Sequence, residues 1–163
     1  MEKKKIQSQK ISTCLWFNNN AEEAAKFYST VFKNAEVGKT VRYGKGGPMP
    51  EGTVLTVAFQ LEGQDFLALN GGPTFTFSEA ISFIINCETQ QEIDYFWDKL
   101  SAGGEIQQCG WLKDKFGVSW QITPSNLGEM LQSGDSEKSG RVFQAVMKMV
   151  KLDMEELEEA YKG

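Results

Sequence analysis

The chain contains an internal repeat: a strand-like segment, an amphipathic helical segment and several β-hairpin segments occur twice, about 70 residues apart. The strand-like segments are the short apolar runs 11–17 and 81–87. A two-fold repeat predicts two related halves and a ligand cavity that both halves line. The helical segments match at Asn20 and Thr89, Glu23 and Glu92, Ala24 and Ile93, Phe27 and Phe96, Tyr28 and Trp97, and Val31 and Leu100.

The first copy predicts one strand, one helix and three further strands. Asn20 with Glu23 predicts the N-terminal cap of the helix, which ends near Asn34. Alternating apolar residues, a glycine- and proline-rich loop and a tight turn define the rest. The expected strands are 36–43, 53–61 and 64–70, joined by a loop at 44–52 and a turn at 62–63.

The second copy has the same order and is followed by helices only. Thr89 with Glu92 forms a capping box that opens a helix, and Gly103 with Gly104 ends it. Asp153 with Glu156 caps the last helix. The expected strands are 80–87, a short strand 105–108 that can continue into 109–113, and 118–123 after a turn at 114–117; the expected helices after Pro124 are 127–131, 142–150 and 154–161, with a loop at 132–140.

These patterns predict an α+β fold. A β-α-β-β-β module cannot close its own sheet, so two such modules are expected to form an eight-stranded, cup-shaped mixed sheet with the helices outside. The predicted organisation is a flexible leader at 1–9, a first βαβββ module at 10–73, a second at 74–124 and a C-terminal helical tail at 125–163.

Composition narrows the class of partner and the compartment. The net charge of −5 argues against nucleic acid as a partner. No run approaches the ~20 apolar residues of a membrane span, and no apolar segment follows the charged start, so we expect neither a membrane partner nor a secretory signal. Three cysteines cannot all pair within the chain, which favours a reducing, cytoplasmic location. The chain has no histidine, the commonest metal ligand.

Four stretches carry a family resemblance: 17–28, 66–73, 109–122 and 147–153. With them the chain resembles the PhnB-like branch of the vicinal oxygen chelate superfamily, which contains glyoxalases, bleomycin resistance proteins and dioxygenases. Members of the branch often carry the label 3-demethylubiquinone-9 3-methyltransferase. The resemblance implies the glyoxalase-like cup-shaped fold and a homodimer. It does not imply one reaction, because this fold carries many activities.

The resemblance also implies where relatives hold a metal: early in the first strand and in the fourth strand of each module. In this chain those positions fall on Ser12, Ser82, Gln121 and the stretch 66–69, which has no carboxylate. Hydroxyl, amide and apolar side chains are poor ligands for divalent first-row ions. We therefore predict no metal and no cofactor.

Strand alternation predicts which residues line the pocket. Ser12, Cys14 and Trp16 share one face, and Leu15 and Phe17 the opposite, helix-covered face. In the second copy, Ser82, Ile84 and Asn86 likewise lie opposite Phe83 and Ile85. The candidate ligand-binding residues are Ser12, Cys14, Trp16, Asn70, Ser82, Ile84, Trp111 and Gln121.

Three functions remain open. The preferred hypothesis is a protein that binds a small organic ligand in a metal-free cavity. The alternative is an enzyme, with the inherited methyltransferase label or a lyase- or isomerase-type activity; its catalytic residues are unknown, and Glu79 and Asp114 are the only candidates for a general base. The Asn18-Asn19-Asn20 run after the first strand is not the glycine-rich loop of common S-adenosylmethionine enzymes. The third is a structural homodimer without a ligand, which the apolar tail favours.

Overall fold

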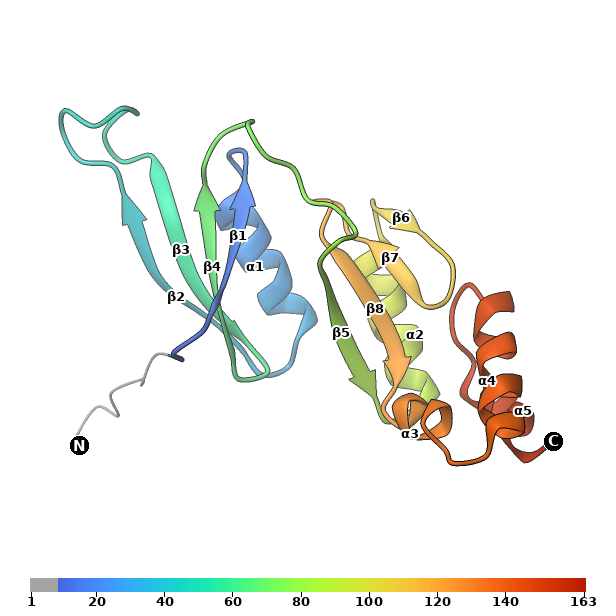
Figure 1. Ribbon diagram of the computed structural model, residues 1–163. Coiled ribbons are helices and arrows are strands. Elements are labelled where there is room, and N and C mark those ends of the chain that lie inside the picture. The colour runs from blue at the N-terminus through green and yellow to red at the C-terminus, as the bar shows by residue number, and fades with distance from the viewer. Residues whose placement is uncertain (1–8) are drawn as a thin grey trace, which may run out of the picture. The chain divides into compact units, whose positions relative to one another are not determined.

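A computed structural model describes residues 9–163, so the leader predicted at 1–9 lies outside the described residues except for Gln9 (Figure 1). The chain divides into two compact units, with the boundary between Thr76 and Phe77. Each unit contains one four-stranded mixed sheet. The chain therefore has an α+β fold with two four-stranded mixed sheets, their helices and a C-terminal helical tail. This confirms the predicted α+β class.

The first unit follows the predicted order of strand, helix and three strands. Its elements are β1 (Thr13–Phe17), α1 (Ala21–Val31), β2 (Ala35–Arg42), β3 (Val54–Leu61) and β4 (Gln64–Asn70). The strand order is β1-β4-β3-β2, with β1 parallel to β4 and the other pairs antiparallel. Glu62 and Gly63 both have positive φ, 46° and 81°, which is the backbone of a two-residue hairpin turn.

The core of the first unit lies on the side of the sheet that α1 covers. Leu15 and Phe17 are buried, while Cys14 is exposed and Trp16 is half-buried, so the predicted alternation of β1 is confirmed. Tyr28 of α1 stacks on Phe59, which in turn stacks on Phe66 at 5.1 Å between ring centroids. These apolar contacts determine which face of the sheet the helix covers.

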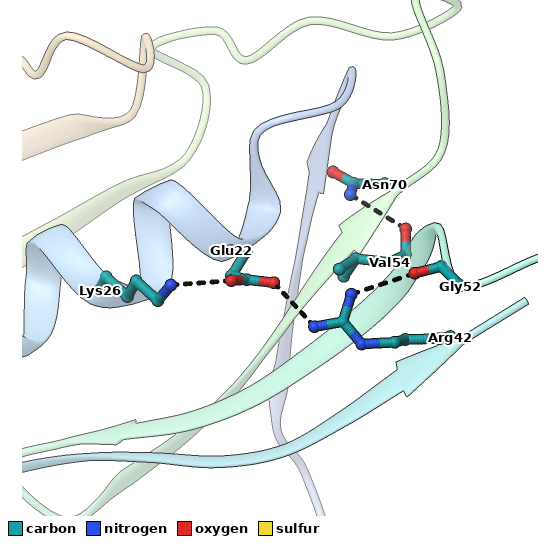
Figure 2. Close-up of polar contacts among 6 residues, drawn as sticks. All are labelled: Glu22, Lys26, Arg42, Gly52, Val54 and Asn70. Carbon is teal, nitrogen blue, oxygen red and sulfur yellow. Dashed lines mark hydrogen bonds and ion pairs between the residues drawn. The ribbon is translucent and has the colours of Figure 1, made fainter.

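The start of α1 is stabilised differently from the prediction. Asn20 flanks the helix, but its side chain makes no capping hydrogen bond within the described residues, and its ψ of 27° is outside the extended region that a capping residue usually adopts. The Oδ1 atom of Asn70 instead accepts from the backbone N–H of Ala21 at 2.9 Å. The Asn70 amide also donates to the carbonyl of Val54 at 3.1 Å (Figure 2), so Asn70 connects α1, β3 and β4.

A second polar connection joins α1 to the loop between β2 and β3. Arg42 donates to the carboxylate of Glu22 at 3.4 Å and to the carbonyl of Gly52 at 3.0 Å (Figure 2). Glu22 also pairs with Lys26 at 2.7 Å, and these cations hold the pKa of Glu22 below its usual value. The exposed pairs connect the end of β2 to the first turn of the helix.

The second unit repeats the same topology and adds the tail. Its elements are β5 (Ser82–Cys87), α2 (Gln90–Ser101), β6 (Glu105–Ile106), β7 (Trp111–Lys113), β8 (Ser119–Pro124), α3 (Leu127–Leu131), α4 (Ser136–Lys148) and α5 (Met154–Lys162). The strand order β5-β8-β7-β6 reproduces that of the first sheet, with β5 parallel to β8. The repeat found in the sequence is therefore a repeat of topology.

Both helix ends predicted for α2 are confirmed. The hydroxyl of Thr89 accepts from the backbone N–H of Glu92 at 3.2 Å, and the carboxylate of Glu92 accepts from the N–H of Glu88 at 2.6 Å. At the other end Gly103 has a φ of 75°, the left-handed conformation that ends many helices.

Two local predictions were wrong. β6 is not continuous with the next strand, because Cys109 and Gly110 adopt φ values of 60° and 80°, and β6 pairs antiparallel with β7. The expected loop 132–140 is half helical: α4 begins at Ser136, since the Asp135 carboxylate accepts from the N–H groups of Glu137 and Lys138. A strong N-terminal cap outweighs the cost of a helical glycine.

The helical tail has its own apolar core and is anchored to the sheet of the second unit. Cys109 and Gly110 donate backbone hydrogen bonds to the carbonyls of Met149 and Val150, at 2.8 and 2.7 Å. A Cβ atom on Gly110 would lie 3.0 Å from Leu152, so only glycine allows this approach. The core residues of the tail are Met130, Val142, Met149, Leu152 and Leu157.

Candidate functional site

Each sheet has one helix-covered face and one face that its own unit's helices leave uncovered. We call the surface of this kind in the first unit the first open face; it contains Cys14, Trp16 and the residues paired with them. We call the corresponding surface in the second unit the second open face; it contains Ser82, Ile84, Trp111 and Gln121. In the second unit, α2 packs against β5, β7 and β8 through buried Ile93, Trp97 and Leu100. The open side of each sheet is therefore where a ligand could reach strand side chains.

Trp16 of the first open face is held by the segment that follows β4. Its indole Nε1 donates to the carbonyl of Gly72 at 2.9 Å, and its ring meets the ring of Phe75 edge-on at 5.0 Å. A Cβ atom on Gly71 would overlap the indole ring. Trp16 is therefore half-buried and rigidly placed, with part of its ring surface accessible.

Cys14 and Ser12 are both exposed, and Cys14 lies beside Leu67 in the sheet. Partial burial raises the pKa of the Cys14 thiol, so the thiol is protonated near neutral pH and is a weak nucleophile. Asn70 does not share this face, because it pairs with Phe17 and both of its amide groups bond to the backbone.

The second open face brings four of the candidate residues together. Gln121 of β8 pairs with Ile84 of β5 on one side and with Trp111 of β7 on the other, so the three side chains form one row across the sheet. Gln121 also donates to the hydroxyl of Ser82 at 2.9 Å. Ile84 is 57% exposed, so an apolar side chain in the row is accessible to solvent.

Sequence reasoning missed two polar residues on the same face. Ser119 pairs with Ser82 and with Lys113, which places these three side chains in a second row beside the first. The hydroxyl of Ser119 is buried and has no hydrogen-bond partner among the described residues. The signal was present, because Lys113 follows Trp111 by two positions and Ser119 precedes Gln121 by two, and strand alternation gives such residues one face.

The two candidate bases lie in different environments. Asp114 is buried at the turn between β7 and β8, where its carboxylate accepts from the backbone N–H groups of Phe116 and Val118 and from the Trp120 indole at 2.9 Å. It is the turn residue that its position suggested. Glu79 forms an ion pair with Lys113 at 2.5 Å, which lowers the pKa of Glu79 and makes it a weaker base.

The positions that the family resemblance assigns to metal ligands do not form a divalent-metal site. Ser82 and Gln121 bond to each other, and hydroxyl and amide groups are weak ligands. Within residues 9–163 no group of three or more His, Cys, Asp or Glu side chains could hold a metal ion. None of the helices in this part of the chain has the length and apolar content needed to cross a bilayer.

The repeated sheets with helices on one face define the fold of the vicinal oxygen chelate class, and comparison with known proteins supports the assignment. A fosfomycin resistance protein, FosX, from Listeria monocytogenes has the same fold, with a TM-score of 0.53 and 18% identity over 78% of this chain and 99% of the other. The model of the 3-demethylubiquinone-9 3-methyltransferase family matches residues 9–123. The chain belongs to that family.

Other solved structures agree. A Bacillus cereus protein described as a PhnB protein of the 3-demethylubiquinone-9 3-methyltransferase type is 41% identical, over 71% of this chain and 99% of the other, with a TM-score of 0.66. Protein PA1353 from Pseudomonas aeruginosa shares the fold at 20% identity, over 72% and 98% of the two chains, with a TM-score of 0.59. A search of curated proteins finds no significant match.

Proposed function

We propose that this protein binds a small organic molecule on its open faces without the help of a metal ion. The observation that carries the proposal is the row of Ile84, Gln121 and Trp111, which places apolar surface beside an amide on the face that the unit's own helices do not cover. Ligand sites are mostly apolar with a few placed polar groups, and this face has that composition. On the first open face, Ser12, Cys14 and Trp16 are the proposed contacts.

Binding is favoured over catalysis by the state of the two candidate bases. Asp114 accepts three hydrogen bonds from its own turn and from Trp120, which orients it away from any substrate. The lowered pKa of Glu79 reduces its ability to take a proton near neutral pH. The 3-demethylubiquinone description of the Bacillus relative names a methyl transfer, which can be tested directly with S-adenosylmethionine.

We further propose that the protein is a cytoplasmic homodimer. Phe143 and Met147 lie one turn apart on α4 and are each 56% exposed, and Val150 follows at 40%. Apolar side chains that cluster on a surface mark association sites. Three unpaired cysteines are consistent with a reducing compartment.

Native mass spectrometry of the purified full chain tests the ligand. We expect a retained small molecule, or a molecule acquired from a cell extract, whose occupancy falls at least tenfold in Trp111→Ala. The matched control is Tyr95→Ala, since Tyr95 is an exposed aromatic residue on α2 rather than on an open face. Equal occupancy in both variants, or methyl transfer from S-adenosylmethionine to a quinone precursor by the wild-type protein, would contradict the proposal.

A further inference from the structure

We propose that Lys113, Ser119 and Ser82 form an anchor for a carboxylate group on the second open face. The ligand of this face is then a flat organic monoanion, and its apolar body lies against Trp111 and Ile84. This inference rests on the proposed function, since it names the class of ligand for the same face. When no ligand is bound, Glu79 pairs with the lysine of this anchor.

The register of the sheet places the anchor and the apolar body side by side. Ser82, Ser119 and Lys113 are directly paired across β5, β8 and β7, and Ile84, Gln121 and Trp111 are paired across the same strands two residues along. Two residues along a strand span about 6–7 Å, and side chains of such residues share a face. An aromatic acid of one or two rings has this separation between its carboxylate and the far edge of its ring system.

The unpaired, buried hydroxyl of Ser119 is the observation that points to a ligand atom. Its side-chain oxygen is buried, the residue is 1% exposed, and no hydrogen-bond partner lies among the described residues. Leaving a buried hydroxyl unpaired is costly, so such groups normally meet a partner. Because Lys113 and Ser82 flank Ser119 in the same row, a ligand oxygen that enters the row and accepts from all three would satisfy the hydroxyl, which is buried in the unliganded chain.

The ion pair of Lys113 with Glu79 shows that the lysine of the anchor accepts a carboxylate. Glu79 comes from the segment before β5, outside any strand or helix, and its side chain is 47% exposed. Exposed ion pairs contribute little to stability, so a ligand carboxylate can replace Glu79 at little cost. The Gln107 amide, which donates to Glu79 at 3.2 Å, remains a partner for the released side chain.

The charges around the anchor restrict the ligand to a single negative charge. Glu105 on β6 pairs with Lys113 in the sheet, so Lys113 faces both Glu79 and Glu105. One lysine beside two carboxylates favours a carboxylate over a doubly charged phosphate. Both glutamates hold the pKa of Lys113 above its usual value, so the ammonium group is charged near neutral pH, where a carboxylate ligand is ionised.

The test is a calorimetric titration of the full chain with 2-naphthoate and with its neutral analogue 2-naphthamide. We expect the wild-type protein to bind the carboxylate at least tenfold more tightly than the amide, and Lys113→Met to lose that preference. Glu79→Gln should raise the affinity for 2-naphthoate severalfold, because the internal competitor loses its charge. Ser119→Ala should lower it severalfold with no loss of thermal stability, because the hydroxyl has no partner to lose.

Lys99→Met on α2 and Glu158→Gln on α5 are the matched charge controls, and neither should change the affinity. Equal affinity for the two probes, absence of binding by both, or a weaker complex in Glu79→Gln would overturn the carboxylate anchor. Any of these three outcomes refutes the anchor but not the proposed function, provided that the wild-type protein still retains a neutral molecule that the Trp111→Ala variant does not retain. Failure of that retention experiment refutes the proposed function itself.

Discussion

At the scale of single residues, Gly71 decides where the Trp16 indole lies. The ring occupies the space that any side chain at position 71 would need, and this contact leaves the indole N–H directed at the carbonyl of Gly72. The shape of the first open face therefore depends on a glycine that the sequence shows only as part of a loop. Glycine is required at position 71 because the indole ring leaves no space for a side chain, and not because the backbone adopts an unusual conformation.

Gly71→Ala should lower the free energy of unfolding by about 1–3 kcal/mol, the usual cost of overpacking. Denaturant unfolding measures the change, and the emission of Trp16 should shift as its ring is displaced. Gly128→Ala is the control, because its Cβ atom would meet nothing within 4 Å in the described chain. A neutral Gly71→Ala variant would show that the loop moves aside freely.

Cys87 makes the stability of the second unit depend on pH in the alkaline range. Burial, with the neighbouring charges of Glu92 and Glu88, raises the pKa of its thiol from 9.0 to about 12. Because the folded pKa is the higher one, the unfolded chain loses the proton first as pH rises. The stability contributed by the neutral thiol is complete below about pH 9 and is lost progressively toward pH 12.

Unfolding free energies measured between about pH 8 and 11 should therefore fall more steeply in the wild-type protein than in Cys87→Ala. Comparing slopes removes the constant cost of the cavity that the substitution leaves. Cys109→Ala, which removes a half-exposed thiol, should keep the wild-type slope. Parallel profiles for wild type and Cys87→Ala would show that the buried thiol does not titrate as described.

At the scale of elements, Gln90 joins the first turn of α2 to the start of α5. Its amide donates to the carbonyl of Leu152 at 3.2 Å, and its Oε1 accepts from the N–H of Met154 at 2.9 Å. Lys151 adds an ion pair to Asp94 at 2.6 Å. Together with the bonds of Cys109 and Gly110, these contacts make the tail an integral part of the second unit.

Gln90→Ala should destabilise the protein by about 1–3 kcal/mol, because it leaves two backbone groups without partners. Hydrogen exchange should become faster at the Met154 amide before it changes in β8. Gln91→Ala is the matched control, since Gln91 is exposed on the same helix turn. Unchanged exchange in α5 would mean that the apolar core alone holds the tail.

Elements were predicted well where one local signal dominates. The capping box at Thr89, the cap at Asp153 and the turn at Glu62 each use neighbouring residues, and each was identified from the sequence. The wrong predictions depend on partners far along the chain or on a missed cap. At Cys109 tail carbonyls hold a left-handed turn, and at the start of α1 Asn70 accepts the hydrogen bond that was expected of Asn20. At Asp135 an overlooked cap begins a helix that runs through Gly140.

At the scale of the whole molecule, the proposed homodimer makes one prediction. The double variant Phe143→Glu with Met147→Glu should sediment as a monomer at micromolar concentration. A stable dimer buries at least ~1,200 Å², and burying two unpaired carboxylates in such an interface is too costly. Tyr95→Glu, which changes an exposed aromatic residue on α2, should keep the wild-type mass. A monomeric wild-type protein would refute the dimer.

The sequence by itself determined the repeat, the α+β class and the face on which each β1 and β5 side chain lies. Periodicity and capping act between residues that are close along the chain, so a single sequence displays them. Leu15 and Phe17 were assigned to the core and Cys14 to the opposite face on this basis alone, and both assignments are confirmed.

Only the tertiary structure decided which polar groups meet across long stretches of sequence. Asn70 caps a helix that begins 49 positions earlier, and Gln121 bonds to Ser82 across 39 positions. No local pattern predicts such partners, because strand register brings them together. The pairing of Lys113, Ser119 and Ser82 arises in the same way, so the chemistry of the second open face became visible only when the sheet was folded.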